Sequence, residues 1–254
     1  MMQGVTRNPL ADPGLLGVTA GANAALALTL AFFPASNYLM ITLACFIGAA
    51  IGTILVVLVG TLAPSGFSPI RIVLAGAAIS AFLYAIADGV SIAFQISKDV
   101  SMWTAGGLIG LSWAQLQIAL PFVIVCIVLA LFLSNQLSIL RMSEDVAVSL
   151  GQNVILIKIA IYTLITILAG TAVALVGNLA FVGLMIPHIA RRIVGSDYKK
   201  ILPMSVLIGG MFMVLADLVG RTINAPFETP VAAIVSVLGL PFFLLIVYKG
   251  VKAS

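Results

Sequence analysis

Residues 39–62 read LMITLACFIGAAIGTILVVLVGTL, and this stretch decides the fold because it contains no charged side chain. A helix rises about 1.5 Å per residue, so about 20 apolar residues cross the roughly 30 Å hydrocarbon core of a membrane. The stretch therefore predicts a transmembrane helix. Similar runs predict eight spans in all, at residues 14–33, 39–62, 70–94, 114–134, 154–177, 179–194, 201–220 and 230–248.

The composition agrees with a polytopic membrane protein. Of 254 residues, 62% are hydrophobic and 8% are charged, and the mean hydropathy is +1.25. Soluble domains are about 45–50% apolar and about 25% charged. Disordered, collagen-like and disulfide-stapled secreted proteins are excluded. Without a linker or repeat, residues 1–254 are predicted to form one all-α transmembrane domain, with Cys45 and Cys126 as small core residues.

The basic residues predict the orientation. Loops on the cytoplasmic side of a membrane protein carry an excess of lysine and arginine. With eight spans, Lys98 and Arg221 fall on one side, and the other ten fall on the side of both termini. We therefore expect both termini in the cytoplasm. The net charge of +4 then reports topology, and no nucleic-acid partner is predicted. The ten are Arg7, Arg71, Arg141, Lys158, Arg191, Arg192, Lys199, Lys200, Lys249 and Lys252.

Several residues predict local structure. The sixth span is short and contains Pro187 and His188, which is typical of a broken helix packed inside protein. Asp12-Pro13-Gly14 places a capping carboxylate and a proline at the start of the first span. Gly48 and Gly52 form a GxxxG pair that permits close helix contact. Residues 95–113, with two tryptophans, are predicted to lie at the outer interface.

Catalytic and metal chemistry find little support. The one histidine, His188, excludes a histidine-rich metal centre within this chain, and no GxxxxGK[ST] phosphate-binding loop occurs. We predict no catalytic residue, no metal ligand and no cofactor.

A polar stripe in the third span is more informative. Ser80, Tyr84, Asp88 and Ser91 recur at steps of three and four residues, so they share one helix face. Polar side chains in a membrane helix face protein or water. The stripe predicts either the wall of a solute pathway or a hydrogen-bonded seam between helices.

Two other clusters carry open alternatives. Asp217 and Arg221 stand four residues apart, so they can form an ion pair on one helix face. This pair is either structural, or the planar guanidinium of Arg221 binds a carboxylate of an external partner. The polar loop 135–153 predicts a short cytoplasmic helix that Ser143 caps and Gly151 ends. That helix is either a plain connector or a docking element for a soluble partner.

Four stretches share one resemblance, in order along essentially the whole chain. They resemble FecCD-type permeases, the membrane subunits of ABC importers for iron–siderophore chelates, haem and vitamin B12. Family members have ten spans, and this chain begins where their second span ends, so the resemblance implies an N-terminally truncated permease domain. The stretches are QGVTRNPLADPGLLGVTAGA (3–22), LSILRMSEDVAVSLG (137–151), GNLAFVGLMIPHIARRIVGSDYKKILP (177–203) and LADLVGRTINAPFETPVAAIVSVLGLPFFLLIVYKG (215–250).

The resemblance implies partners and residue roles. The partners are a second permease subunit, as homodimer or heterodimer, two ATP-binding subunits and an extracytoplasmic solute-binding protein. Coupling to the ATPase is implied for Ser143, Glu144, Asp145, Leu150 and Gly151. The third span, with Ser80, Tyr84, Asp88 and Ser91, matches a pathway-lining helix. Docking of the binding protein is implied for Arg221 and Glu228.

The sequence thus predicts a permease subunit in the bacterial inner or plasma membrane. It would import iron chelates, such as iron–siderophore or haem, by alternating access, while a separate chain hydrolyses ATP. A vitamin B12 importer permease stays open as an alternative. So does an ion-coupled secondary transporter that uses Asp88 and Asp217, or a membrane scaffold that does not transport.

Overall fold

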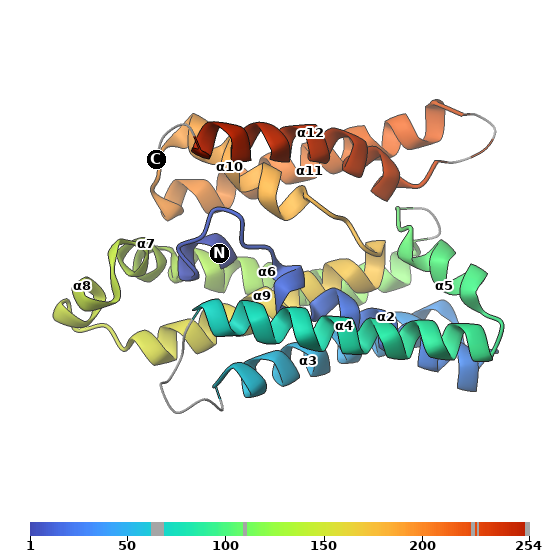
Figure 1. Cartoon of the computed structure of the whole chain (residues 1–254). Helices are drawn as coiled ribbons and strands as arrows, with labels where there is room; N and C mark the ends of the chain where they lie inside the picture. The colour runs from blue at the N-terminus through green and yellow to red at the C-terminus, as the bar shows by residue number, and fades with distance from the viewer. Residues whose placement is uncertain (62–68, 109–110, 225–226, 228, 252–254) are drawn as a thin grey trace.

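The computed structural model describes residues 1–61, 69–108, 111–224, 227 and 229–251, and all regular structure within them is helical (Figure 1). Each predicted span carries a helix. Within these described ranges, five helices are long and apolar enough to cross a membrane: α3 (Tyr38–Thr61), α4 (Pro69–Ala93), α6 (Trp113–Phe132), α9 (Val154–Val176) and α11 (Tyr198–Thr222). The other three are α2 (Val18–Phe32), α10 (Val182–Val194) and α12 (Val231–Val251).

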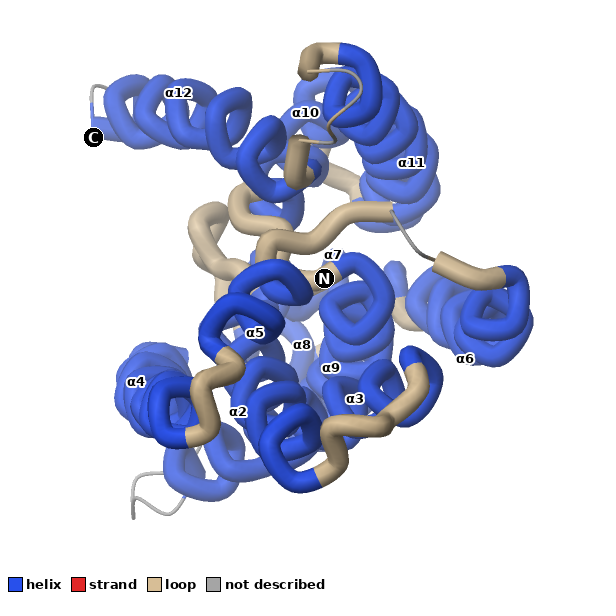
Figure 2. Tube along the Cα trace, turned by 90° about the vertical axis from the view of Figure 1, so that its right-hand side faces the viewer, coloured by secondary structure: helices blue, strands red, loops and turns tan. Residues whose placement is uncertain are grey.

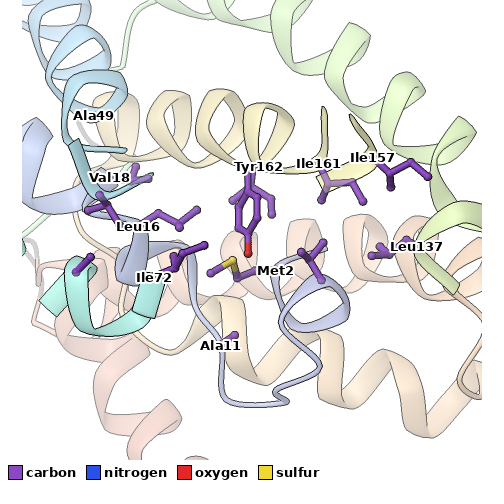
Figure 3. Packing of buried hydrophobic residues seen from close by; sticks show 14 of the residues in the cluster. Met2, Ala11, Leu16, Val18, Ala49, Ile72, Leu137, Ile157, Ile161 and Tyr162 are labelled. Atoms are coloured by element: carbon purple, nitrogen blue, oxygen red, sulfur yellow. The ribbon is translucent and has the colours of Figure 1, made fainter. Parts of the chain in front are cut away.

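The helices form two groups. Helices α2, α3, α4 and α9 pack together, and α10, α11 and α12 form a second layer beside them (Figures 1 and 2). The shared core lies among α2, α3, α9 and the N-terminal segment, where Leu16, Ile161 and Tyr162 are buried (Figure 3). Many outward-facing apolar side chains stay exposed, as expected for a protein surrounded by lipid.

The contact between α2 and α3 depends on glycine. The predicted GxxxG pair, Gly48 and Gly52, lies against Gly21 and Gly17, so that the backbones touch. A Cβ atom at Gly21 would lie 2.9 Å from the carbonyl carbon of Gly48. Only glycine permits this approach, which confirms the interpretation of the GxxxG pair as a close helix contact.

The start of the first span is a separate short turn. Asp12 caps a 3-10 helix, η1 (Pro13–Leu16), by accepting a hydrogen bond of 2.8 Å from the backbone N–H of Gly14. Gly17 follows with φ of 73°, in the left-handed region, and α2 begins at Val18. The predicted capping carboxylate and proline are confirmed, although they open η1 instead of the apolar helix itself.

The sixth span is broken. Helix α10 has 13 residues, about 20 Å of helix, which is too short to cross the membrane alone. The chain covers the remaining depth with the non-helical residues 177–181, which add up to about 16 Å. Phe181 has φ of 67° where this stretch enters α10. A broken sixth helix was the expectation, and its strongly amphipathic sequence explains why it lies against α11 and α12.

Short helices complete the two ends of the bundle. Helix α5 (Ser97–Thr104) lies at one end, where the ring of Trp103 packs 4.3 Å from that of Tyr38. Helices α7 (Ser134–Met142) and α8 (Glu144–Ser149) lie at the other end, near α1 (Met2–Val5) (Figure 1). The sequence predicted α8 but not α7, because α7 begins after Leu133 without the side-chain cap that marks the start of α8.

Candidate functional site

The short surface helix α8 is capped at both of its ends. At the start, the Ser143 hydroxyl oxygen accepts a hydrogen bond of 3.0 Å from the backbone N–H of Val146. At the end, Gly151 has φ of 78°, and the N–H groups of Gly151 and Gln152 donate to the carbonyls of Val148 and Ala147. These paired bonds are the Schellman motif, which needs a left-handed residue. The predicted boundaries of the helix are confirmed.

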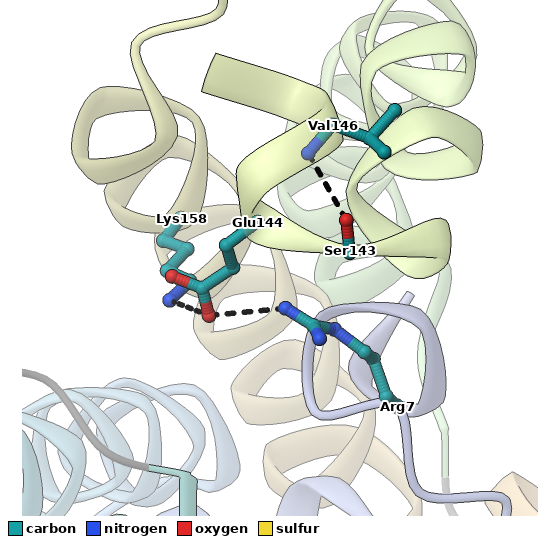
Figure 4. A network of polar contacts seen from close by, with 5 residues as sticks. All are labelled: Arg7, Ser143, Glu144, Val146 and Lys158. Atoms are coloured by element: carbon teal, nitrogen blue, oxygen red, sulfur yellow. Dashed lines mark hydrogen bonds and ion pairs between the residues drawn. The ribbon is translucent and has the colours of Figure 1, made fainter. Parts of the chain in front are cut away.

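Glu144 ties α8 to two other parts of the chain. Its Oε1 atom lies 2.7 Å from Lys158 Nζ on α9 and 3.2 Å from a guanidinium nitrogen of Arg7 (Figure 4). The Lys158 side chain is only 5% exposed, whereas those of Glu144 and Arg7 are about two-fifths exposed. A buried ammonium group needs a nearby opposite charge, because desolvation is costly. We call the contact of Arg7, Glu144 and Lys158 the Glu144 junction.

The opposite side of α8 faces away from the helix bundle. Asp145 is exposed, and Val148 and Leu150 are 62% and 64% exposed, whereas Ala147 is completely buried against the bundle. Exposed apolar side chains at a charged, water-facing end of a membrane protein are typical of a protein contact surface. Of the predicted coupling residues, Asp145 and Leu150 therefore face away from the bundle, and Glu144 points toward it. Ser143 and Gly151 cap the two ends of the helix.

A cavity of about 700 Å³ lies between the two helix groups. Ser80 and Tyr84 of the predicted polar stripe line it, together with η1, residues 177–184 and Met213. Asp88 is exposed one turn further along α4. Ser91 is buried, and its hydroxyl donates to the Ala87 carbonyl of its own helix at 2.6 Å. The stripe is therefore divided, with only its first two members on the cavity.

Sequence reasoning missed polar residues on the cavity wall. Asp12, Thr19 and Asn178 line the cavity beside Ser80 and Tyr84. Burial raises the pKa of the Asp12 carboxyl, although its hydrogen bond from Gly14 opposes this shift. Asn178 stands in the non-helical stretch after α9, where its backbone N–H donates to the Thr104 carbonyl at 3.3 Å. The interruption of the sixth span was the signal that could have identified Asn178.

The predicted pair at the end of α11 forms. Arg221 Nε lies 2.8 Å from Asp217 Oδ2, with Arg221 46% exposed and Asp217 16% exposed. Helix α11 starts beside α7 and ends at the opposite end of the bundle, the end at which α5 also lies (Figure 1). Arg221 therefore lies at the end away from α8. Glu228, its predicted companion, lies outside the residues that the structure describes.

Comparison with known proteins adds close relatives. The family model described as the FecCD transport family matches residues 1–249. The iron(3+)-hydroxamate import system permease protein FhuB of Bacillus subtilis is 40% identical over 96% of this chain and 63% of its own length. The iron-uptake system permease protein FeuB of the same organism is 40% identical over 98% of this chain and 75% of its own length.

Other relatives extend this result. The ferric enterobactin transport system permease protein FepD of Escherichia coli is 36% identical over 100% of this chain and 76% of its own length. A solved structure, described as an inward-facing conformation of a metal-chelate type ABC transporter, aligns with a TM-score of 0.87 at 27% identity. That alignment covers 97% of this chain and 79% of the other. The chain thus spans 63% to 79% of the lengths of these four proteins.

Proposed function

The chain belongs to the FecCD transport family, and on this premise we propose that it is the permease subunit of an ABC importer for ferric chelates. It is a multi-pass protein of the bacterial inner, or plasma, membrane, and such permeases are not themselves enzymes. The observation that carries the proposal is the family match over residues 1–249, joined by permeases named for iron-hydroxamate and enterobactin transport. These names support iron held in an organic chelate as the cargo class.

The energy for transport comes from a separate ATP-binding subunit at the end that carries α8. Arg141 at the end of α7, Arg191 and Arg192 at the end of α10, and Lys199 at the start of α11 place basic residues at this end. The positive-inside rule therefore makes it cytoplasmic. Asp145, Val148 and Leu150 present the contact surface, while Ser143, Glu144 and Gly151 hold α8 in its position.

The solute passes beside the cavity between the helix groups. Ser80 and Tyr84 contact the solute at the wall of this cavity. Asp88, which is exposed, and Ser91, which is buried, lie further along the same helix, α4, and complete the proposed pathway-lining helix. A second permease subunit completes the pathway. At the outer end, Arg221 offers its partly exposed guanidinium to an extracytoplasmic solute-binding protein. We assign docking of the same partner to Glu228 from its place in the sequence alone.

Iron uptake in the native bacterium tests this proposal. Cells that lack the chain and cells that have regained it would be given radioactive iron as a hydroxamate, citrate or catecholate chelate. We expect uptake of at least one chelate to require the chain, to stop when ATP is depleted and to tolerate a protonophore while ATP is maintained. Uptake of all three chelates without the chain would refute the proposal. Uptake that stops with the proton gradient but survives ATP depletion would favour a secondary transporter instead.

A further inference from the structure

We propose that Glu144 is a positioning residue that links α8 mechanically to the wall of the cavity, through Arg7. The inference rests on the proposed function, because α8 is taken as the element that the ATPase moves. Movement of α8 reaches the cavity through the N-terminal segment. The route runs from Glu144 to Arg7, through residues 8–11 to Asp12 and η1, and ends beside Ser80 and Tyr84.

The first step is the anchoring of α8 to α9. Glu144 Oε1 lies 2.7 Å from Lys158 Nζ, and the Lys158 side chain is 5% exposed. A charge-assisted hydrogen bond at this distance is strong and directional. Helix α8 contains only six residues and also packs through the buried Ala147, so the anchored carboxylate adds a direct tie between this short helix and α9.

The second step is the contact with Arg7. The same carboxylate oxygen lies 3.2 Å from the Arg7 guanidinium, so one atom joins three segments of the chain (Figure 4). Arg7 has φ of 52°, in the left-handed region that residues other than glycine rarely adopt. Such a conformation persists when the surroundings hold it in place. The strain at Arg7 therefore indicates that the position of this residue is fixed.

The third step is the short path from Arg7 to the cavity. Asn8 forms a compact turn, since its side-chain oxygen accepts from the Leu10 N–H at 2.9 Å and its carbonyl accepts from the Ala11 N–H at 3.1 Å. Asp12 then caps η1, and Leu15 lies so close to Gly76 of α4 that no Cβ would fit there. A hydrogen-bonded turn between two fixed ends transmits displacement better than an open loop does.

Hydrogen exchange on the purified full chain tests the mechanical part. In R7Q, which leaves Glu144 and Lys158 paired, we expect the hydrogen-bonded amides within residues 8–12, those of Leu10 and Ala11, to exchange about tenfold faster while those of α8 are unchanged. In E144Q, both segments should exchange faster. The matched control R192Q removes an exposed charge at the same end and should change neither segment. If R7Q leaves residues 8–12 unchanged, or E144Q affects α8 alone, the proposal is overturned.

Transport by the complex tests the functional part. The chain would be purified with its ATPase subunits and placed in vesicles, and uptake would be divided by ATP hydrolysed. We expect R7Q and E144Q to bind the ATPase subunits within about twofold of the wild-type level. The ratio of uptake to ATP hydrolysed should fall about tenfold in both variants, whereas R192Q leaves this ratio unchanged. If the ratio stays at the wild-type value, or if ATPase binding falls in parallel with uptake, Glu144 does not transmit movement.

A double variant and the wild-type chain distinguish loss of stability from loss of transmission. Because E144Q leaves the buried ammonium group of Lys158 without this carboxylate, E144Q/K158M removes both charges and should restore stability without restoring the ratio. A restored ratio would show that the junction acts through stability alone. If the wild-type chain binds no ATPase, the proposed function fails, while hydrogen exchange still decides whether the Glu144 junction links α8 to residues 8–12.

Discussion

Substitution of Gly21 by alanine tests the packing at the centre of the fold. The new Cβ would overlap the Gly48 carbonyl oxygen and lie 2.9 Å from its carbon, where ordinary contacts begin near 3.4 Å. Because both obstacles are backbone atoms and the oxygen is the nearer, α2 and α3 must move apart by about 1 Å, and a gap of that size removes about half of each dispersion contact. Overpacking of this kind costs about 1–3 kcal/mol.

The net effect includes an opposing term. Alanine favours the helical state over glycine by about 0.5–1 kcal/mol, so we expect a net loss of about 1 kcal/mol in the free energy of unfolding. A domain of this size changes its Tm by about 2–4 °C per kcal/mol, which gives a fall of about 2–4 °C. The chain supplies its own probes, since Cys45 and Cys126 are buried free thiols that react with a fluorogenic maleimide only when the fold opens.

Gly89 provides the matched control for this experiment. It also lies within a helix, α4, but a Cβ there would meet nothing within 4 Å. G89A should therefore leave the labelling midpoint unchanged or raise it slightly. If G21A and G89A gave the same midpoint in detergent, the close contact of α2 with α3 would not stabilise the fold, and the packing argument would be wrong.

Three further substitutions test the ends and the cavity. S143A removes the cap of α8 and should weaken that helix by about 1 kcal/mol, seen as faster amide exchange in residues 144–149 with an unchanged Tm; a lower Tm would contradict a local role. R221A breaks an exposed pair, so its effect on the free energy of unfolding should stay below about 1 kcal/mol, while binding of the solute-binding protein weakens; unchanged binding would exclude a docking role. S80W places a bulky ring in a cavity of about 700 Å³, which is large enough for one ligand; iron uptake should fall about tenfold or more with little change in Tm, and normal uptake would place the pathway elsewhere.

The sequence predicted those features that depend on neighbouring residues. Hydropathy located a helix in each of the eight predicted spans, and local chemistry identified the caps at Asp12, Ser143 and Gly151. Each of these signals acts within a few residues, so no knowledge of the tertiary arrangement is needed. The Asp217–Arg221 pair was found for the same reason, because one helical turn separates its members.

Features that depend on distant segments could not be predicted. The Glu144 junction joins residues that lie far apart in the sequence, and no spacing rule connects Arg7 with α8. The division of the polar stripe also depends on packing, since the neighbours of α4 decide that Ser80 and Tyr84 meet the cavity while Asp88 is exposed. Helical periodicity shows which side chains share a face, but not what that face meets.

The break before α10 restricts where lipid can go. The flanking helices satisfy some backbone groups of residues 177–181, since Gly177 N–H donates to Val173 of α9 and the Phe181 carbonyl accepts from Met185 of α10. The other amide and carbonyl groups of this stretch lie outside any helix, and hydrocarbon tails offer them no hydrogen bonds. Neighbouring backbone meets part of this need, because Asn178 N–H donates to Thr104 and Gly107 N–H donates to Val176 next to the break. The remaining groups require protein or water at every stage of a working cycle. Acyl chains must therefore stay out of this stretch while the helices around it rearrange, so protein or water has to enclose it from the end that carries α5 to the start of α10.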